Sequence, residues 1–175
     1  MSDRVTVTMD RGVADVRLNR ADKMNALDHA MFDALVETSA ALAEEPGVRA
    51  VVLSGEGRAF CAGLDFGSFQ KMAGDADAEA VDSVSAKPED RITHHGQQAV
   101  YGWTDLPVPV IAAVTGVALG GGIQLALGAD LRYIAPDARM SVLEIRWGLV
   151  PDMTGTQRLI ELVGVDVAME LTLTG

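Results

Sequence analysis

The stretch VPVIAAVTGVALGGGIQLAL, residues 108–127, decides how this chain folds. Its first part, 108–114, is an apolar run with prolines at its start, where a missing N–H is tolerated, and it predicts a buried strand. Four glycines follow within 116–122, and residues 123–127 predict a helix. A glycine turn between a strand and a helix presents unpaired backbone N–H groups, which suit a phosphate or an oxyanion. The alternative interpretation is close packing of the backbone against a neighbouring segment.

The glycine cluster fits neither of the usual nucleotide-binding patterns. A P-loop would need lysine after Gly121, and position 122 is glycine. A dinucleotide fingerprint would need glycine at position 125, where leucine stands. A nucleotide-binding domain is therefore disfavoured.

The same region carries no charge over 24 residues, from Leu106 to Ala129, which is long enough to span a bilayer. It also contains Pro107, Pro109 and five glycines, which would leave backbone groups unsatisfied in lipid. A buried strand, a tight loop and a buried helix are the better interpretation.

Outward from this stretch, strand and helix signals alternate, which predicts an α/β fold. Strand signals lie at Val5–Met9 and Ala14–Leu18, which form a hairpin around a glycine turn, and at Ala50–Leu53 and Leu131–Ile134. Helix signals run from an Asp28 N-cap to about Glu45, and over 92–106, 154–163 and 165–173. The first helix should bury one face, made of Phe32, Leu35, Val36, Ala40, Leu42 and Ala43.

Composition limits the classes of function. The chain has 175 residues, 49% of them hydrophobic, so it is long and apolar enough for one domain with a true core. Lys+Arg number 14 and Asp+Glu 25, giving a net charge of −11, which disfavours nucleic acid and anionic membranes as partners. One cysteine excludes a disulfide scaffold and a cysteine metal site. The N-terminus has no signal-peptide pattern, and we expect a cytoplasmic protein.

A second small-residue turn, Phe60–Phe66, also follows a predicted strand. Two such turns facing one another would form an oxyanion hole, which stabilises charge developing on a carbonyl oxygen. Cys61 within this turn could be a nucleophile, but no histidine lies near it in sequence; the three are His29, His94 and His95. A small buried residue is the favoured interpretation of Cys61.

Two acids complete the candidate chemistry. Glu144 stands in the apolar setting Val142–Ile145, and Asp152 follows Pro151. Apolar neighbours disfavour the ionised carboxylate, which raises the pKa toward a working pH. Two such groups could take a proton at one carbon and return it at another. The alternative is surface acids in an acid-rich chain.

In this combination the sequence resembles the enoyl-CoA hydratase/isomerase (crotonase) superfamily across essentially all 175 residues. Each matching segment is weak alone, but their order and spacing are specific. The segments are Leu18–Arg20 with Asn25–Leu27, Phe60–Asp65, Pro109–Gly116, Leu119–Gly122, Ala129–Arg132, and Gly148–Pro151 with Gly155–Arg158.

The resemblance implies a spiral of ββα units that binds an acyl-CoA thioester, with coenzyme A as part of the substrate and no further cofactor. It places the two oxyanion-hole amides at Leu64 and Gly121. It places coenzyme A contacts at Lys23, Met24, Ala26 and Ala62. In so acidic a chain, contacts to coenzyme A phosphate should come from local bases such as Lys23 and Arg20.

The acid positions bear on the reaction. Hydratases of the family carry two glutamates, and these positions hold Gln124 and Glu144 here; an amide is no general acid or base. Dienoyl-CoA isomerases of the family carry a glutamate and an aspartate eight residues apart, which match Glu144 and Asp152. The leading hypothesis is double-bond isomerisation of an enoyl- or dienoyl-CoA in fatty acid metabolism, with Gln124 orienting substrate or water. The alternatives are a 2-enoyl-CoA hydratase using Glu144, and a non-catalytic acyl-CoA-binding paralogue or truncated product.

The length of the chain leads to further expectations about which part of the family fold it contains. Family members usually run ~80–90 residues further, so residues 1–175 should be the spiral core with the C-terminal helical region missing. Apolar surface should then be exposed over residues 154–175. The acidic stretch 74–91 should be a mobile loop near the acyl pocket. Relatives commonly form trimers or hexamers, and we expect the same of a full-length chain.

Overall fold

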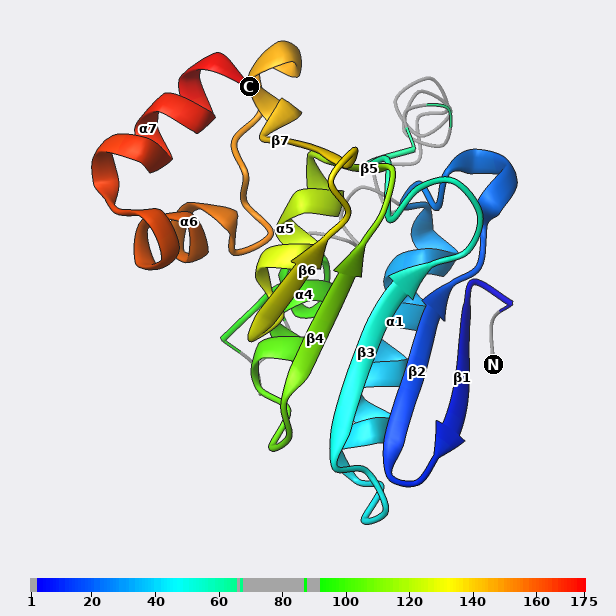
Figure 1. The fold of residues 1–175 in the computed structure, drawn as a ribbon. Helices are drawn as coiled ribbons and strands as arrows, with labels where there is room; N and C mark the ends of the chain where they lie inside the picture. Colours follow the sequence, from blue (N-terminus) through cyan, green and yellow to red (C-terminus); the bar gives the residue numbers. More distant parts are fainter. Residues whose placement is uncertain (1–2, 66, 68–86, 88–91) are drawn as a thin grey trace.

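A five-stranded sheet forms the centre of the computed structural model, which describes residues 3–65, 67, 87 and 92–175 (Figure 1). The strand order is β1-β2-β3-β4-β6, and every neighbouring pair is parallel except the β1–β2 hairpin. The predicted hairpin and strands are confirmed, which brings the carboxyl ends of four parallel strands to one edge of the sheet. Their bounds are β1 Val5–Asp10, β2 Val13–Leu18, β3 Ala50–Gly55, β4 Val110–Val114 and β6 Leu131–Ile134.

A second, smaller sheet lies beyond that edge. It pairs β5 (Val117–Leu119) with β7 (Arg139–Ser141), and single bridges extend the same pairing pattern from Ala118 to Cys61 and from Leu64 to Leu27. Each of the four strands β2, β3, β4 and β6 is therefore followed by a segment in this second layer and then by a helix. This repetition is the ββα spiral that the resemblance implied. The sequence reading missed β5 and β7, because three residues show too little alternation to signal a strand.

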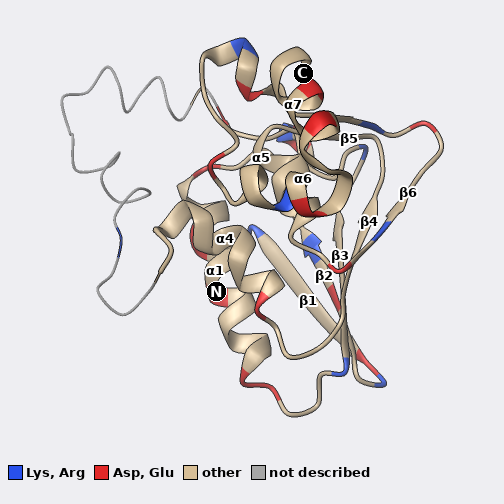
Figure 2. Cartoon of the chain, turned by 90° about the vertical axis from the view of Figure 1, so that its left-hand side faces the viewer, with Lys and Arg blue, Asp and Glu red and all other residues tan. Residues whose placement is uncertain are grey.

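The helices cover one face of the large sheet, and the other face carries none in the described part of the chain (Figure 2). α1 (His29–Ala43) begins where the Asp28 carboxylate accepts a hydrogen bond from the Met31 N–H, as the predicted N-cap should. α4 (His95–Thr104) packs against α1, and α5 (Gly121–Leu127) follows the glycine cluster. The main core fills the space between these helices and the sheet.

The predicted buried face of α1 is wrong at two positions. Ala40 and Ala43 are exposed, whereas Ser39 is buried. The reason is Gly102 of α4: a Cβ there would lie 2.3 Å from the Ser39 Oγ, so the missing side chain lets the two helices approach at this serine. The Ser39 hydroxyl is satisfied by donating to the Val36 carbonyl at 3.1 Å.

The uncharged stretch 106–129 folds as β4, β5 and α5, so the prediction of a strand, a turn and a helix is confirmed. Within the described residues, no helix combines the length and hydropathy needed to cross a membrane. The predicted mobility of 74–91 concerns residues outside the described ones, apart from Lys87.

Two helices close the chain on the side of the molecule opposite β1, α6 (Gly155–Val163) and α7 (Val165–Thr174) (Figure 1). They pack on one another and bury only a few residues, among them Leu159 and Ala168. The expected exposure of apolar side chains here is confirmed for Ile160, Leu162, Val163, Val165, Val167, Met169, Leu171 and Leu173.

Candidate active site

A cavity of about 270 Å³ lies where the two sheet layers meet the segment between β7 and α6. Three segments supply most of its wall: 62–64, 120–124 and 143–153. The lining residues are Phe32, Ala62, Gly63, Leu64, His94, Gly96, Gly120, Gly121, Gln124, Leu143, Glu144, Trp147, Leu149, Val150, Asp152 and Met153. The two small-residue turns predicted to face one another therefore do so, and both predicted acids line the same cavity.

Leu64 and Gly121 bring backbone N–H groups to this cavity. The neighbours of Leu64 hydrogen-bond to Leu27: the Gly63 carbonyl accepts from the Leu27 N–H at 2.8 Å, and the Asp65 N–H donates to the Leu27 carbonyl at 2.9 Å. Gly121 is the first residue of α5, where helical N–H groups have no intrahelical partner. Among the described residues, neither amide has a protein acceptor, so both can bind an oxygen atom of a ligand.

Glycine is required at two positions beside these amides. At Gly63, with φ +84°, a Cβ would lie 2.4 Å from the Leu119 carbonyl oxygen. At Gly122 it would lie 2.2 Å from the Cys61 carbonyl oxygen. The close-packing interpretation of the glycine cluster is thus confirmed, and this packing is what brings the two turns together.

Glu144 is the buried acid of the cavity, only 7% exposed, and lies in the short 3-10 helix η2 (Leu143–Trp147). Its Oε1 accepts a hydrogen bond of 2.6 Å from the Gln124 amide nitrogen. Its Oε2 is buried and, within the described residues, has no hydrogen-bond partner. Burial raises the pKa of Glu144, and the nearby charge of Asp152 adds to this, while hydrogen bonds from backbone and Gln124 oppose it.

Gln124 is tied at both ends of its amide. Its nitrogen donates to Glu144, and its oxygen accepts from the Gly155 N–H at 3.0 Å, at the start of α6. The side chain is buried, so it holds Glu144 in one orientation and leaves the carboxylate one free oxygen. This clamp was not foreseen in the sequence, where Gln124 was expected to orient substrate or water.

Asp152 differs from the expectation of an acid among apolar neighbours, because it is exposed at the rim of the cavity. Its backbone carbonyl accepts from the Gln97 amide at 3.1 Å. The same Gln97 side chain accepts from the His94 N–H at 3.2 Å, which ties the beginning of α4 to this rim.

Cys61 is fully buried, as the favoured interpretation predicted. Burial raises the pKa of its thiol to about 12, because the thiolate would be desolvated. The thiol donates to the Asn25 carbonyl at 3.2 Å and accepts from the Gly63 N–H at 3.4 Å. It supports the turn and does not reach the cavity.

Of the four predicted coenzyme A contacts, only Ala62 lines the cavity. Its N–H donates to the Met24 carbonyl at 2.9 Å, so the segment 23–26 runs beside the cavity. Lys23 is exposed and ends the short helix η1 (Ala21–Lys23), whereas Ala26 is buried.

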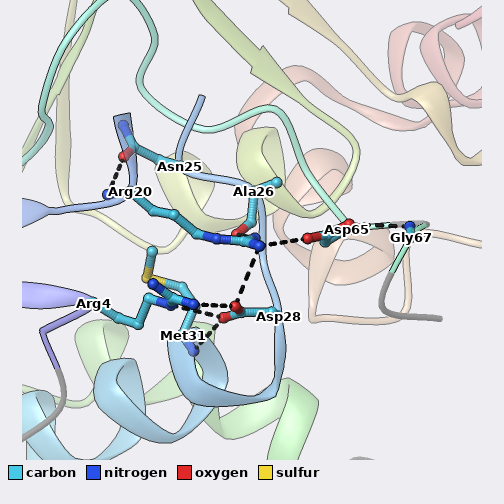
Figure 3. A network of polar contacts seen from close by, with 8 residues as sticks. All are labelled: Arg4, Arg20, Asn25, Ala26, Asp28, Met31, Asp65 and Gly67. Carbon is cyan, nitrogen blue, oxygen red and sulfur yellow. Dashed lines mark hydrogen bonds and ion pairs between the residues drawn. The ribbon is translucent and has the colours of Figure 1, made fainter. Parts of the chain in front are cut away.

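Arg20, expected as a second base for phosphate, instead contacts acceptor groups of the protein itself (Figure 3). Its side chain is 11% exposed, lies 2.7 Å from Asp65 and 3.5 Å from Asp28, and donates to the Ala26 carbonyl at 2.9 Å. The expectation is wrong for Arg20, because folding surrounds the guanidinium with protein acceptors.

Several apolar lining residues and His94 were not foreseen as site residues. Phe32 faces the cavity from α1, Trp147 from η2, and Leu149 and Val150 from the loop after it. No local signal marks them, because their role depends on the fold bringing distant segments together. Apolar side chains on this wall suit an acyl chain.

Comparisons with known proteins agree with this geometry. The family model described as enoyl-CoA hydratase/isomerase matches residues 8–175. A probable enoyl-CoA hydratase of Bacillus subtilis is 32% identical over 171 residues, 98% of this chain and 62% of that protein. The peroxisomal Delta(3,5)-Delta(2,4)-dienoyl-CoA isomerase of Arabidopsis thaliana is 33% identical over 165 residues, 94% of this chain and 59% of that protein.

Solved structures give the same result. The crystal structure of a putative enoyl-CoA hydratase from Streptomyces coelicolor superimposes with a TM-score of 0.88 at 35% identity. The match covers 100% of this chain and 61% of that one. The chain thus spans about three-fifths of the length of these relatives.

Proposed function

The chain belongs to the enoyl-CoA hydratase/isomerase family, and we propose that it moves the carbon–carbon double bond of an enoyl- or dienoyl-CoA through a thioester enolate. The reaction needs no cofactor beyond the coenzyme A that the substrate carries. The observation that carries the proposal is one cavity that holds two acceptor-free backbone amides and two carboxyl side chains.

The Leu64 and Gly121 amides would bind the thioester oxygen. Removal of a proton from the carbon next to the thioester carbonyl turns that oxygen into an enolate oxyanion. Fixed N–H donors stabilise such developing charge, and loss of one donor typically costs about 10²–10³-fold in rate. Both amides are held by backbone contacts, which favours a preorganised oxyanion hole.

Glu144 would remove the proton from C2, because it lines the same cavity and its Oε2 has no hydrogen-bond partner among the described residues. A raised pKa makes its carboxylate a stronger base. The electron pair of the broken C–H bond moves into the thioester, and the extended enolate then takes a proton at its distal carbon from Asp152, which draws it from water. Glu144 then releases the C2 proton to water, so both acids return to their starting state. One proton leaves and one arrives, so the product is an isomer of the substrate.

The Gln124 clamp favours isomerisation over hydration. Hydration of a 2-enoyl-CoA must both activate water and protonate C2. Gln124 supplies no proton, and each end of its amide is hydrogen-bonded to the protein. Glu144 with Asp152 supplies two proton carriers on one wall, which matches a proton moved between two carbons.

Hydration of 2-enoyl-CoA by Glu144 alone is the second candidate. It is favoured by the names of relatives, since several are called enoyl-CoA hydratases, such as a mitochondrial protein of Pongo abelii at 37% identity over 160 residues. Glu144 would then serve as base and acid in turn.

Three substrates distinguish these functions. The protein should be incubated with a 3-enoyl-CoA, a 3,5-dienoyl-CoA and a 2-enoyl-CoA in D₂O, and the products followed by chromatography and mass spectrometry. We expect 2-enoyl or 2,4-dienoyl products that carry deuterium at the carbon protonated last, C4 of the 2-enoyl and C6 of the 2,4-dienoyl product, and deuterium at C2 of recovered substrate. Addition of water to the 2-enoyl-CoA without isomerisation would establish the hydratase. Binding without turnover or exchange would indicate the non-catalytic alternative.

Replacing Asp152 separates the two acids. Asp152→Asn should lower isomerisation by about 10²-fold or more, yet keep deuterium exchange at C2 within a few-fold of the original rate. Glu161→Gln is the control, because Glu161 is exposed in α6 and does not line the cavity. A change under about twofold in isomerisation would remove Asp152 from the mechanism.

A further inference from the structure

A half-buried charge pair, Arg20 with Asp65, lies next to the Leu64 amide in the chain. Asp65, the next residue, is 17% exposed at its side chain and lies 2.7 Å from the Arg20 guanidinium. Its other carboxylate oxygen accepts from the Gly67 N–H at 3.0 Å. The backbone that follows the Leu64 amide is therefore held by the Asp65 carboxylate, which contacts Arg20 on one oxygen and the Gly67 N–H on the other (Figure 3).

The same guanidinium also holds the segment that pairs with Leu64. While one Arg20 nitrogen contacts Asp65, the other donates to the Ala26 carbonyl at 2.9 Å. Ala26 precedes Leu27, whose backbone hydrogen-bonds on both sides of Leu64. One rigid, planar group thus connects the two strands of backbone that frame this amide.

Asp28 leaves Arg20 available for this task. The Asp28 carboxylate is taken by Arg4 through contacts of 2.7 and 3.2 Å and also caps α1. Arg20 lies farther from Asp28, at 3.5 Å, than from Asp65, at 2.7 Å. Arg4 is thus the nearer guanidinium to Asp28, and Arg20 contacts Asp65 with its opposite charge.

We infer that Arg20 and Asp65 are positioning residues for the Leu64 amide, which rests on the proposed function of that amide in an oxyanion hole. The pair has two effects. It fixes the direction of the N–H, and it cancels a negative charge one residue from the place where the enolate oxygen develops. Without the Arg20 charge at 2.7 Å, the Asp65 carboxylate would repel that oxygen more strongly and weaken its stabilisation.

The test is a double-mutant cycle. Arg20→Gln leaves Asp65 charged, and we expect kcat for isomerisation to fall about tenfold or more with KM within about threefold, since only transition-state stabilisation is lost. Arg20→Gln with Asp65→Asn removes both charges and should recover part of this loss. Arg17→Gln is the matched control, because it removes a guanidinium from Asp15 and Glu56 and leaves the Arg20–Asp65 pair intact.

Carbonyl polarisation gives a readout that lost stability would not move. A saturated acyl-CoA with a ¹³C thioester carbonyl should show a red-shifted C=O stretch when bound to the original protein. We expect a smaller shift in Arg20→Gln and an unchanged one in Arg17→Gln. A red shift and kcat equal to the original in folded Arg20→Gln would overturn the inference. No red shift and no C2 exchange in the original protein would instead refute the proposed oxyanion hole.

Discussion

The cavity has two walls that the chain holds in different ways. The amide wall, residues 62–64 with 120–122, is built of backbone, hydrogen-bonded to Leu27 and with no room for added side chains at Gly63 and Gly122. The carboxylate wall, residues 143–153, is built of side chains, and residues 145–150 are all exposed although several line the cavity.

The difference follows from what each wall would have to do. Stabilising an oxyanion requires donors fixed in place before the charge appears. Proton transfer along an acyl chain requires groups that can serve more than one carbon. The carboxylate wall itself contains one acid that is fixed in place, the buried Glu144 held by Gln124, and one that is exposed, Asp152. If this comparison is right, an added side chain should destabilise the amide wall strongly and the carboxylate wall only slightly.

The largest effect is expected from alanine at Gly63. Its φ is +84°, and a Cβ would lie 2.4 Å from the Leu119 carbonyl oxygen, a backbone atom that cannot rotate away. Overpacking together with the left-handed conformation should cost about 3–5 kcal/mol of unfolding free energy. Because Gly63 precedes Leu64, turnover should also be lost. Urea unfolding followed by circular dichroism measures the first effect, and the isomerase assay the second.

Gly148 on the carboxylate wall is the matched control. Its φ is +68°, but a Cβ there would meet nothing within 4 Å. Gly148→Ala should therefore cost only the conformational part, about 1–2 kcal/mol. Equal losses of unfolding free energy in the two variants would show that the positive φ alone sets the cost of the added Cβ. The two walls would then not differ in packing.

The second effect concerns the buried acid. Glu144→Gln keeps the shape and the bond from Gln124 but cannot accept a proton, so C2 exchange and isomerisation should fall about 10²–10⁴-fold. In the original protein, kcat/KM should fall as the pH drops through the Glu144 pKa. Burial raises that pKa, so the fall should begin above pH 4.5, the ordinary value for this group. Steady-state rates across pH measure this, and a flat profile down to pH 4.5 would contradict it.

The sequence was sufficient to predict those elements that neighbouring residues determine. The hairpin, the Asp28 cap and the strand, turn and helix over 108–127 all follow from periodicity and turn chemistry. β5 and β7 did not, because a three-residue strand is defined by its partner and not by its own pattern.

The features of the site also differ in whether the sequence alone could predict them. Leu64, Gly121, Glu144 and Asp152 could be predicted to share a cavity because motif order fixed the segments that carry them. The Gln124 clamp, the engagement of Arg20 and the roles of His94 and Trp147 could not. Each depends on the distance between side chains from segments far apart in sequence, such as Gln124 and Gly155.

The smallest effect, and the one that separates stability from catalysis, is the response of Glu144→Gln to pH. A carboxyl whose pKa is raised by folding stabilises the fold fully below its unfolded pKa, and this contribution is lost as pH rises through the folded pKa. The original protein should therefore lose stability relative to Glu144→Gln as the pH rises above about 4.5. The variant's Tm should exceed the original's near pH 7, with little difference at pH 4. Calorimetry at both pH values measures this, with the exposed Glu161→Gln as a control expected to show no such gain. A variant less stable at neutral pH would mean that the carboxylate is well solvated, and that the carboxylate wall is more open than its buried acid indicates.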